Sequence, residues 1–296
     1  MLTAASSIAW CNGRWLPAES IQLALSDPGI ATGALITDMC RTYGGRLFEH
    51  PRHVARFLRD AAACFIPLPV TESQLGDLAT EVLRRNNVGA ADDGEVVLNT
   101  LATPQTLILR LLPLDENRHR PWREQGVPLW LTPPHPPSQL LPPTIKHRNR
   151  LAWHIAAQLA PAGSLALTTD EQGHVLETAL GNLLLVREGA VWAARPGTVL
   201  DSISQQVVRE CCLVRGIAWH EADRTAEADE ALLCGTAFGL VGVAAIGTRP
   251  YACPGPLTRQ LLLDWERLTR VAKGEVSSPV QSIGATGAVE CRREGN

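Results

Sequence analysis

Lysine is almost missing from this chain of 296 residues. Only Lys146 and Lys273 are lysines, and every other one of the 27 basic residues is an arginine. An arginine keeps its proton at working pH, whereas a lysine amine can lose its proton and attack a carbonyl carbon. Each retained lysine is therefore a candidate for chemistry. A preference for arginine codons would also explain the scarcity, so composition alone does not choose between the two explanations.

The chain also lacks an excess of positive charge, because 30 acidic residues outnumber 27 basic ones and the formal net charge is −3. This balance gives no electrostatic reason to expect a nucleic acid or an anionic membrane as partner. The eight cysteines include no C-x-x-C pair and no zinc-type cluster. We therefore expect no metal, and we expect buried free thiols in a reducing compartment.

No targeting segment stands out. The first thirty residues lack a charged start followed by an unbroken apolar block, so no signal peptide is indicated. The uncharged stretch from 231 to 248 contains four glycines, and this favours a buried strand, a glycine turn and a second strand over a bilayer span. We expect a cytoplasmic protein.

The first 115 residues read as a small α/β domain. Asn12-Gly13 is a favoured hairpin turn between two apolar strands. Period-two and helical patterns then predict strands over 36–43, 95–101 and 107–112 and helices over 53–64 and 75–83. The charged, aperiodic stretch that follows suggests a connection over residues 116–126.

Residues 127–275 read as a second, larger domain, followed by a weakly ordered tail over 276–296. Six prolines between 133 and 143 predict an extended segment that leads to Lys146. Short strands separated by tight turns then indicate a mixed, barrel-like sheet. The predicted strands cover 127–131, 164–168, 174–177, 182–187, 190–193 and 217–221, and the predicted helices cover about 149–160, 203–215 and 256–272.

Two residues of this second domain are candidates for a site. Lys146 stands beside two arginines, which by itself is typical of a solvated basic surface. Glu177 ends an apolar strand-rich stretch, where a buried carboxylate needs a cationic partner, although a surface position at a strand end would also explain it.

At this point the chain resembles the class IV aminotransferases, the fold-type IV pyridoxal 5'-phosphate enzymes that include branched-chain and D-amino acid aminotransferases and 4-amino-4-deoxychorismate lyase. The resemblance covers about residues 8–270, and its specificity comes from the order of motifs that are weak singly. These motifs are Asn12-Gly13, Asp27-Pro-Gly-Ile-Ala-Thr-Gly33, the strand ending at Gly45, His53-Val-Ala-Arg56-Phe, Lys146-His-Arg-Asn-Arg, Asp170-Glu-Gln-Gly-His-Val-Leu-Glu177, Asn182-Leu-Leu-Leu-Val, Leu200-Asp-Ser-Ile-Ser204 and Ala228-Asp-Glu-Ala-Leu-Leu-Cys-Gly-Thr-Ala237.

The resemblance implies an α+β fold with a small α/β N-terminal domain and a larger barrel-like mixed-sheet C-terminal domain. It implies that Lys146 forms a Schiff base with pyridoxal 5'-phosphate and later moves a proton. Glu177 would pair with the protonated pyridine nitrogen of the cofactor. The residues implied for its phosphate are Arg56, Ile203, Ser204 and Thr236.

The resemblance also implies substrate contacts, and these are where the chain departs from the family. Thr37 and Asp38 occupy the substrate-facing strand where many aminotransferases have an aromatic residue and a glutamate. Arg41 and the backbone at Thr236-Ala237 are candidates for binding a carboxylate. Ser202 replaces a loop glycine, Gln205 replaces an arginine, and Leu151 replaces an aromatic residue that can bind the cofactor ring oxygen.

Three functions remain open. Transamination between an amino acid and a 2-oxo acid is favoured, because Asp38 preserves the acidic character common in transaminases. Aminodeoxychorismate lyase, which forms 4-aminobenzoate and pyruvate, is the alternative, because the segment from Lys146 to Leu151 resembles that enzyme. A non-catalytic protein that binds pyridoxal phosphate is the third. The resemblance further implies a homodimer in which the partner completes the substrate pocket.

Overall fold

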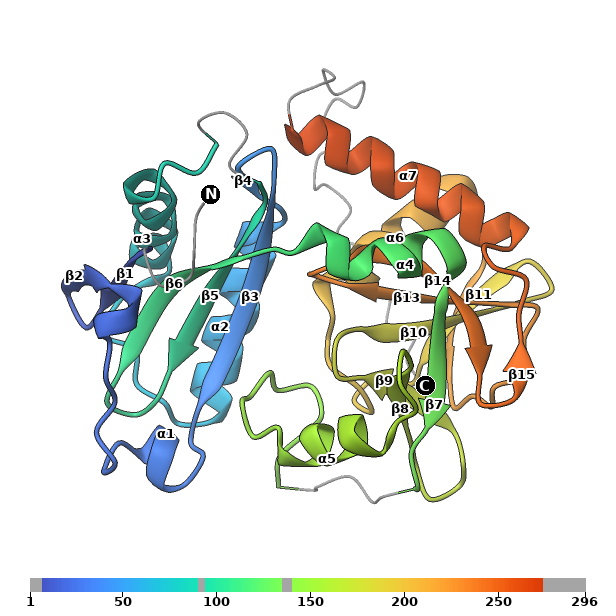
Figure 1. Ribbon diagram of the computed structural model, residues 1–296, viewed down its shortest axis with the longest axis horizontal. Coiled ribbons are helices and arrows are strands. Elements are labelled where there is room, and N and C mark those ends of the chain that lie inside the picture. Colours follow the sequence, from blue (N-terminus) through green and yellow to red (C-terminus); the bar gives the residue numbers. More distant parts are fainter. Residues whose placement is uncertain (1–6, 90–93, 135–139, 274–296) are drawn as a thin grey trace, which may run out of the picture.

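Two separate sheets organise the chain, and each is the centre of one domain (Figure 1). The structure is a computed structural model that describes residues 7–89, 94–134 and 140–273. The expected weakly ordered tail from 276 onward lies outside the described residues. The predicted α+β fold, with its small and large domains, is confirmed.

The first domain is a six-stranded sheet in the order β2-β1-β6-β5-β3-β4. The hairpin turn at Asn12 and Gly13 has positive φ angles of 44° and 84°, as a tight turn between twisted strands requires. Its strands are β1 (Ile8–Cys11), β2 (Arg14–Pro17), β3 (Ile36–Tyr43), β4 (Arg46–Leu47), β5 (Val96–Ala102) and β6 (Leu107–Pro113). Its helices are η1 (Ala18–Ser20), α1 (Pro28–Ala31), α2 (His50–Ala63) and α3 (Glu72–Arg85).

Helices α2 and α3 pack on one face of this sheet because each has an apolar face. Phe57 and Ala61 of α2 and Leu75, Ala79 and Val82 of α3 are buried at helical spacing in one hydrophobic cluster with β5 and β6. Thr71 and Gln74 form a capping box that fixes the start of α3. Helix α2 is thereby held along β3, and this arrangement brings its polar residues to the edge of the second domain.

The second domain is a nine-stranded sheet that closes on itself. Strands β10, β13, β14, β7, β8 and β9 pair in a ring, and the pairing of Glu177 with Asn182 joins β9 back to β10. Strand β7 runs parallel to both of its neighbours. The strands are β7 (Val127–Leu131), β8 (Leu165–Thr169), β9 (Val175–Thr178), β10 (Asn182–Arg187), β11 (Ala190–Ala194), β12 (Trp219–Ala222), β13 (Glu230–Gly235), β14 (Gly239–Ile246) and β15 (Arg249–Pro250).

Residues of β10 alternate between two hydrophobic cores. Leu183 and Leu185 join the interior of the barrel, whereas Leu184 and Val186 face the cluster under α6 and α7. The near-continuous apolar sequence of this strand follows from burial on both faces. The helices of this domain are α5 (Leu151–Leu159), α6 (Ile203–Arg215) and α7 (Pro256–Lys273), and no helix of the described residues is long and apolar enough to cross a membrane.

The stretch expected as a connection between the domains is helical rather than irregular. It contains η2 (Glu116–His119) and α4 (Arg120–Gln125). His119 and Trp122 pack their rings against Phe238, with centroids 5.8 and 5.6 Å from it. The connection therefore belongs structurally to the barrel. No helix was predicted here, because the six residues of α4 are too few to show a helical period.

Arg224 is a fully buried cation that holds three strands together. Only 2% of its surface is exposed, and among the described residues it has no carboxylate partner. Its guanidinium donates instead to the backbone carbonyls of Leu183, Trp192, Val175 and Leu176. The last two carbonyls directly precede Glu177, so Arg224 also fixes the strand that carries this residue.

Replacement of Arg224 by methionine is expected to lower the free energy of unfolding by about 2–4 kcal/mol, because buried carbonyls lose their donor. Arg195→Met, which removes an exposed arginine paired with Asp223, is the control and should change little. Thermal and urea unfolding measure both variants. Equal stability of the two variants would contradict this role.

Candidate active site

A cavity of about 610 Å³ lies where the two domains meet. The first domain contributes Arg56 from α2, and the barrel contributes the segment around Lys146, Glu177 of β9 and the loop at Gly235-Thr236. Residues of α5, Leu200 and Ser202 complete its wall. A volume of this size is typical of a site for small molecules. The structure thus brings four of the residues predicted from sequence to one cavity.

Lys146 is fixed through its backbone, and the first domain supplies the partners. Its N–H donates to the Asp60 carboxylate at 2.9 Å, and its carbonyl accepts from the N–H of Thr37 at 2.9 Å. The next residue, His147, forms an isolated β-bridge with Ile36. The lysine segment therefore lies along β3 like a short additional strand, although its sequence belongs to the second domain.

The side chain of Lys146 lines the cavity and forms no hydrogen bond or ion pair with a described residue. Burial and the nearby Arg56 guanidinium lower the pKa of its amine to about 8, although Asp38 and Glu177 oppose the shift. The unprotonated amine, which is the form that attacks a carbonyl carbon, is therefore more populated near neutral pH than in an ordinary lysine.

Glu177 also lines the cavity, and its carboxylate forms no ion pair among the described residues. Burial raises the pKa of this carboxyl to about 7, against the opposing effects of the Leu200 N–H, Lys146 and Arg150. The Leu200 N–H donates to the Glu177 Oε2 at 3.3 Å. A buried carboxylate without a cation is costly, so this position suits a ligand that brings its own positive charge.

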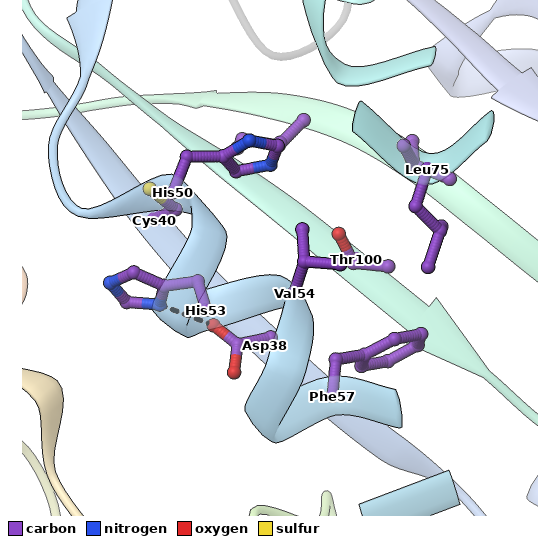
Figure 2. A pocket seen from close by; sticks show the side chains of 10 residues that line it. Asp38, Cys40, His50, His53, Val54, Phe57, Leu75 and Thr100 are labelled. Atoms are coloured by element: carbon purple, nitrogen blue, oxygen red, sulfur yellow. Dashed lines mark hydrogen bonds and ion pairs between the residues drawn. The ribbon is translucent and has the colours of Figure 1, made fainter. Parts of the chain in front are cut away.

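Arg56, Asp38 and His53 form a buried polar group at the first-domain wall. The Asp38 carboxylate accepts from the Arg56 Nε at 2.9 Å. It lies 2.6 Å from the His53 Nδ1, and Figure 2 shows this contact in a small pocket that is separate from the large cavity. Burial opposes ionisation of Asp38, but Arg56 and His53 more than offset it and hold its pKa well below the usual range. The Arg56 Nη1 donates to the Asp201 carbonyl, so this guanidinium spans the two domains.

The start of α6 offers neutral donors beside Arg56. Ser202 caps the helix by accepting from the Gln205 N–H at 3.3 Å, so the serine in place of the family's glycine has a structural role. Ser204 and Thr236 line a second, small cavity together with His53 and Ile203. N–H groups in the first turn of a helix have no partner within the helix, so they can bind an anion.

Sequence reasoning missed a bridge made of Arg59, Asp60 and Asp201. Arg59 donates to Asp60 at 3.0 Å and to Asp201 at 2.6 Å. Asp60 in turn holds the Lys146 backbone, and Asp201 lies directly before the cap of α6. The sequence signal that could have identified Asp60 as a site residue was its spacing from Arg56, because this spacing places both residues on one face of α2.

The residues expected to contact substrate are not brought to the large cavity. Thr37 is buried against Thr100 and Asn99, and Asp38 is committed to Arg56 and His53. Arg41 is paired with Glu116 and donates to the Ala237 carbonyl, which ties β3 to the second domain. These three polar side chains have protein partners in the described structure, and their contact with substrate remains a prediction.

The structure shows the surroundings of two residues that differ from the family pattern, Leu151 and Gln205. Leu151 is 67% exposed and lies outside the cavity wall. The Oε1 atom of Gln205 is buried without a hydrogen-bond partner among the described residues.

Comparison with known proteins identifies the family. Residues 35–246 match the family model of class IV aminotransferases, which covers most of the chain. The chain belongs to this family and is an aminotransferase. Class IV aminotransferases are enzymes that use pyridoxal 5'-phosphate and act on amino acids and keto acids.

Individual relatives agree with this assignment. D-alanine aminotransferase of Staphylococcus epidermidis is 25% identical over 273 residues, which cover 86% of this chain and 95% of that one. A putative branched-chain-amino-acid aminotransferase of Methanocaldococcus jannaschii is 24% identical over 257 residues, covering 81% and 88%. These names do not favour the lyase alternative.

Solved structures share the fold. The branched-chain aminotransferase of Thermoproteus uzoniensis with norvaline superposes with a TM-score of 0.81 at 21% identity, covering 92% of this chain and 96% of that one. The branched-chain amino acid aminotransferase of Escherichia coli also gives a TM-score of 0.81, at 19% identity, covering 89% of this chain and 95% of that one. The two-domain architecture is thus that of class IV aminotransferases.

The raised pKa of Glu177 predicts a pH-dependent stability of the protein without cofactor. A carboxyl whose folded pKa is raised stabilises the fold below its unfolded pKa and loses that contribution as pH rises through about 7. Glu177→Gln should therefore raise the free energy of unfolding at pH 8 by about 2 kcal/mol, and by little near pH 4.5.

Urea unfolding of the cofactor-free protein at several pH values measures this difference. Glu171→Gln, at an exposed turn, is the matched control and should show none. A difference that does not vary with pH would refute the assigned environment of Glu177.

Proposed function

We propose that the protein transfers an amino group between an amino acid and a 2-oxo acid, with pyridoxal 5'-phosphate bound to Lys146 as a Schiff base. The observation that carries this proposal is the placement of Lys146 and Glu177 on one cavity, each without an ion-pair partner among the described residues. The cofactor has an aldehyde for the amine and a basic ring nitrogen for the carboxylate, and when bound it supplies an electron sink for the substrate carbon.

The donors proposed for the cofactor phosphate are Arg56 and Thr236, which line the large cavity, and Ile203 and Ser204, which line the small cavity that also contains Thr236. Arg56 has N–H groups left after its bonds to Asp38 and Asp201, since a guanidinium carries five. The Ile203 and Ser204 amides at the start of α6 and the Ser204 and Thr236 hydroxyls complete the set. Asp38 acts here by fixing the guanidinium plane of Arg56 rather than by touching substrate.

Lys146 has a second task in this proposal. Once the substrate has released it from the cofactor, the Lys146 Nζ would hold and move the proton of the substrate α-carbon. A pKa of about 8 suits both directions of this transfer near neutral pH. Glu177 would pair with the protonated ring nitrogen of the cofactor, which the neutral amide of a glutamine could not do.

Chemical trapping tests the attachment and the reaction. Borohydride reduction of the yellow holoenzyme followed by peptide mapping should place pyridoxyl on Lys146. A single-turnover mixture with L-glutamate, a branched-chain L-amino acid or D-alanine should convert the absorbance of the holoenzyme to that of the pyridoxamine form. Lys146→Arg should abolish both results. A label on Lys273, or no conversion by any donor together with release of pyruvate from aminodeoxychorismate, would overturn the proposal.

We also infer a homodimer in the cytoplasm. Leu151, Ile155 and Leu159 form an apolar stripe on α5 and are 67%, 51% and 60% exposed. Ile155 and Leu159 border the large cavity, so a second copy of the chain seated on the stripe would also close the cavity. The seven described cysteines are free thiols, of which Cys40, Cys211, Cys212 and Cys234 are buried, and this supports a reducing compartment.

Sedimentation tests the proposed dimer. The unmodified chain should sediment as a dimer, and Ile155→Glu should shift it toward the monomer, because a charge would be buried in the interface. Helix α7 lies on the opposite side of the barrel from α5 (Figure 1). Leu263→Glu, at a residue of α7 that is 56% exposed, is the control and should remain dimeric. A monomeric unmodified protein with full activity would refute the dimer.

A further inference from the structure

Arg41 is a buried cation of the first domain that bonds to the second domain. It belongs to β3, and only 4% of its surface is exposed. Its Nη1 donates to the Ala237 carbonyl at 3.0 Å, although the two residues are 196 positions apart in the sequence. Ala237 lies in the turn of residues 236–238 that joins β13 to β14. Arg41 therefore holds the turn from which Thr236 lines the large cavity.

The guanidinium of Arg41 is itself fixed in place. Its Nε donates to the Thr42 carbonyl at 3.2 Å, and its Nη2 donates to the Glu116 carboxylate at 2.6 Å. The guanidinium carbon lies 4.0 Å from the centroid of the Tyr43 ring. Because a guanidinium is planar, bonds from all three nitrogens restrict it to one orientation. The Nη1 is thus a donor of fixed position for the Ala237 carbonyl.

Strand pairing holds the two ends of the turn but not its middle. Gly235 pairs with Gly239 across the hairpin. Phe238 is buried in the core of the barrel. In the described part of the chain, the bond from Arg41 is the sole hydrogen bond between residues 236–238 and a residue outside the hairpin. The position of the first two turn residues therefore depends on this bond.

The end of the turn packs against the same face of β3. Gly239 has a φ of +77°, and a Cβ there would lie 2.6 Å from the Trp265 Nε1 and 3.2 Å from the Tyr43 hydroxyl. The Trp265 Nε1 donates to this hydroxyl at 3.2 Å. Arg41 and Tyr43 are two positions apart on a strand, so their side chains lie on one face of it. This face of β3 is a fixed surface that locates the turn.

A small cavity places Arg41 close to the donors proposed for the cofactor phosphate. Arg41, Ile203, Ser204 and Thr236 all line it, and its volume is about 10 Å³. This volume has room for about one water molecule and no larger ligand. Arg41 is absent from the wall of the large cavity. Any effect of Arg41 on the phosphate therefore passes through the residues that it holds.

We propose that Arg41 positions the turn of residues 236–238 for the cofactor phosphate, so that contact between the two domains completes the phosphate site. This inference rests on the proposed binding of pyridoxal 5'-phosphate and adds a positioning residue to it. A hydroxyl donates to a phosphate oxygen only within about 3 Å, so a displacement of about 1 Å removes the bond. Loss of Arg41 frees the Ala237 carbonyl and displaces the Thr236 hydroxyl, although no group that touches the cofactor is removed.

Two ligands that differ only at the phosphate test this role. The affinity of the cofactor-free protein is measured for pyridoxal 5'-phosphate and for pyridoxal, and the ratio of the two affinities gives the contribution of the phosphate. Arg41→Met should lower this ratio about tenfold, because a hydrogen bond to a charged group is lost. The affinity for pyridoxal should stay within about threefold, which also shows that the variant is folded around Lys146. The phosphorus NMR resonance of the bound cofactor should move.

Two further variants separate position from charge. Arg123 donates to the same Glu116 carboxylate and does not bond to the turn, so Arg123→Met is the matched control and should keep the ratio within about threefold. Arg41→Lys keeps the charge but lacks the planar group that bonds to Glu116 and Ala237 together. It should still lower the ratio by at least about threefold. A ratio fully restored by lysine, or an equal loss in Arg123→Met, would show that charge alone acts and would overturn the proposal.

A double variant tests whether Arg41 acts through the turn. Thr236→Val removes the hydroxyl and keeps the shape of the side chain. If Arg41 acts by placing this hydroxyl, Arg41→Met should lower the ratio much less in the Thr236→Val protein than in the unmodified protein. Fully additive losses would refute the role of the turn.

The outcomes also separate this inference from the proposed function. If Arg56→Met and Thr236→Val lower the ratio and Arg41→Met does not, only the role of Arg41 is refuted. If none of the three lowers it, the proposed phosphate site fails together with this inference. A loss confined to the KM of the amino donor would assign Arg41 to the substrate and overturn the proposal. If no donor converts the holoenzyme, transamination fails, and the two affinities still decide the role of Arg41.

Discussion

The backbone of Lys146 is bonded to the first domain, and the arrangement of the site depends on this attachment. The lysine segment takes its hydrogen bonds from β3 and from Asp60, whereas its side chain points to the cavity free of described partners. The amine is thus positioned without being neutralised. Arg59 extends the attachment to Asp201, which connects the same lysine to the start of α6. Residues of α2 would therefore position both the lysine that binds the cofactor aldehyde and the start of α6 that binds its phosphate.

Charges at the site are arranged so that a ligand completes them. Lys146 has a lowered pKa and Glu177 a raised pKa, because burial disfavours the charged form of each. Arg56 and Asp38 satisfy one another, so this wall is stable without a ligand. The Glu177 carboxylate and the Lys146 amine are the groups without an ion-pair partner among the described residues. The paired charges support the site, and the charges without a protein partner are the ones expected to act on a ligand.

Much of the fold could be predicted from sequence because local patterns decide it. The hairpin at Asn12-Gly13, strand β3 and helix α6 agree with their predicted bounds, since turn chemistry and periodicity act over a few residues. The barrel-like sheet was predicted, but the pair of strands that closes it could not be identified from sequence, because closure depends on β9 pairing with both β8 and β10. Short helices such as α4 have too few turns to show a pattern.

Some residues of the site could likewise be predicted from sequence, and others could not. Lys146, Glu177, Arg56 and Thr236 meet at one cavity as their motifs suggested. Thr37, Asp38 and Arg41 could not be oriented from sequence, because β3 is buried on both faces and alternation then carries no information. The Arg59–Asp201 pair joins residues 142 positions apart, and no local pattern reports such a contact.

The barrel is sealed at a single residue pair, and the seal lies inside the site. Glu177 pairs with Asn182 across the seam between β9 and β10. The Asn182 side chain donates to the Leu200 carbonyl at 3.1 Å, and the Leu200 N–H donates to Glu177. These three residues form a closed triangle between the seam and the loop that leads into α6. Displacement of Leu200 would break a hydrogen bond to each residue of the seam, so the position of this loop and the closure of the barrel at β9 depend on each other.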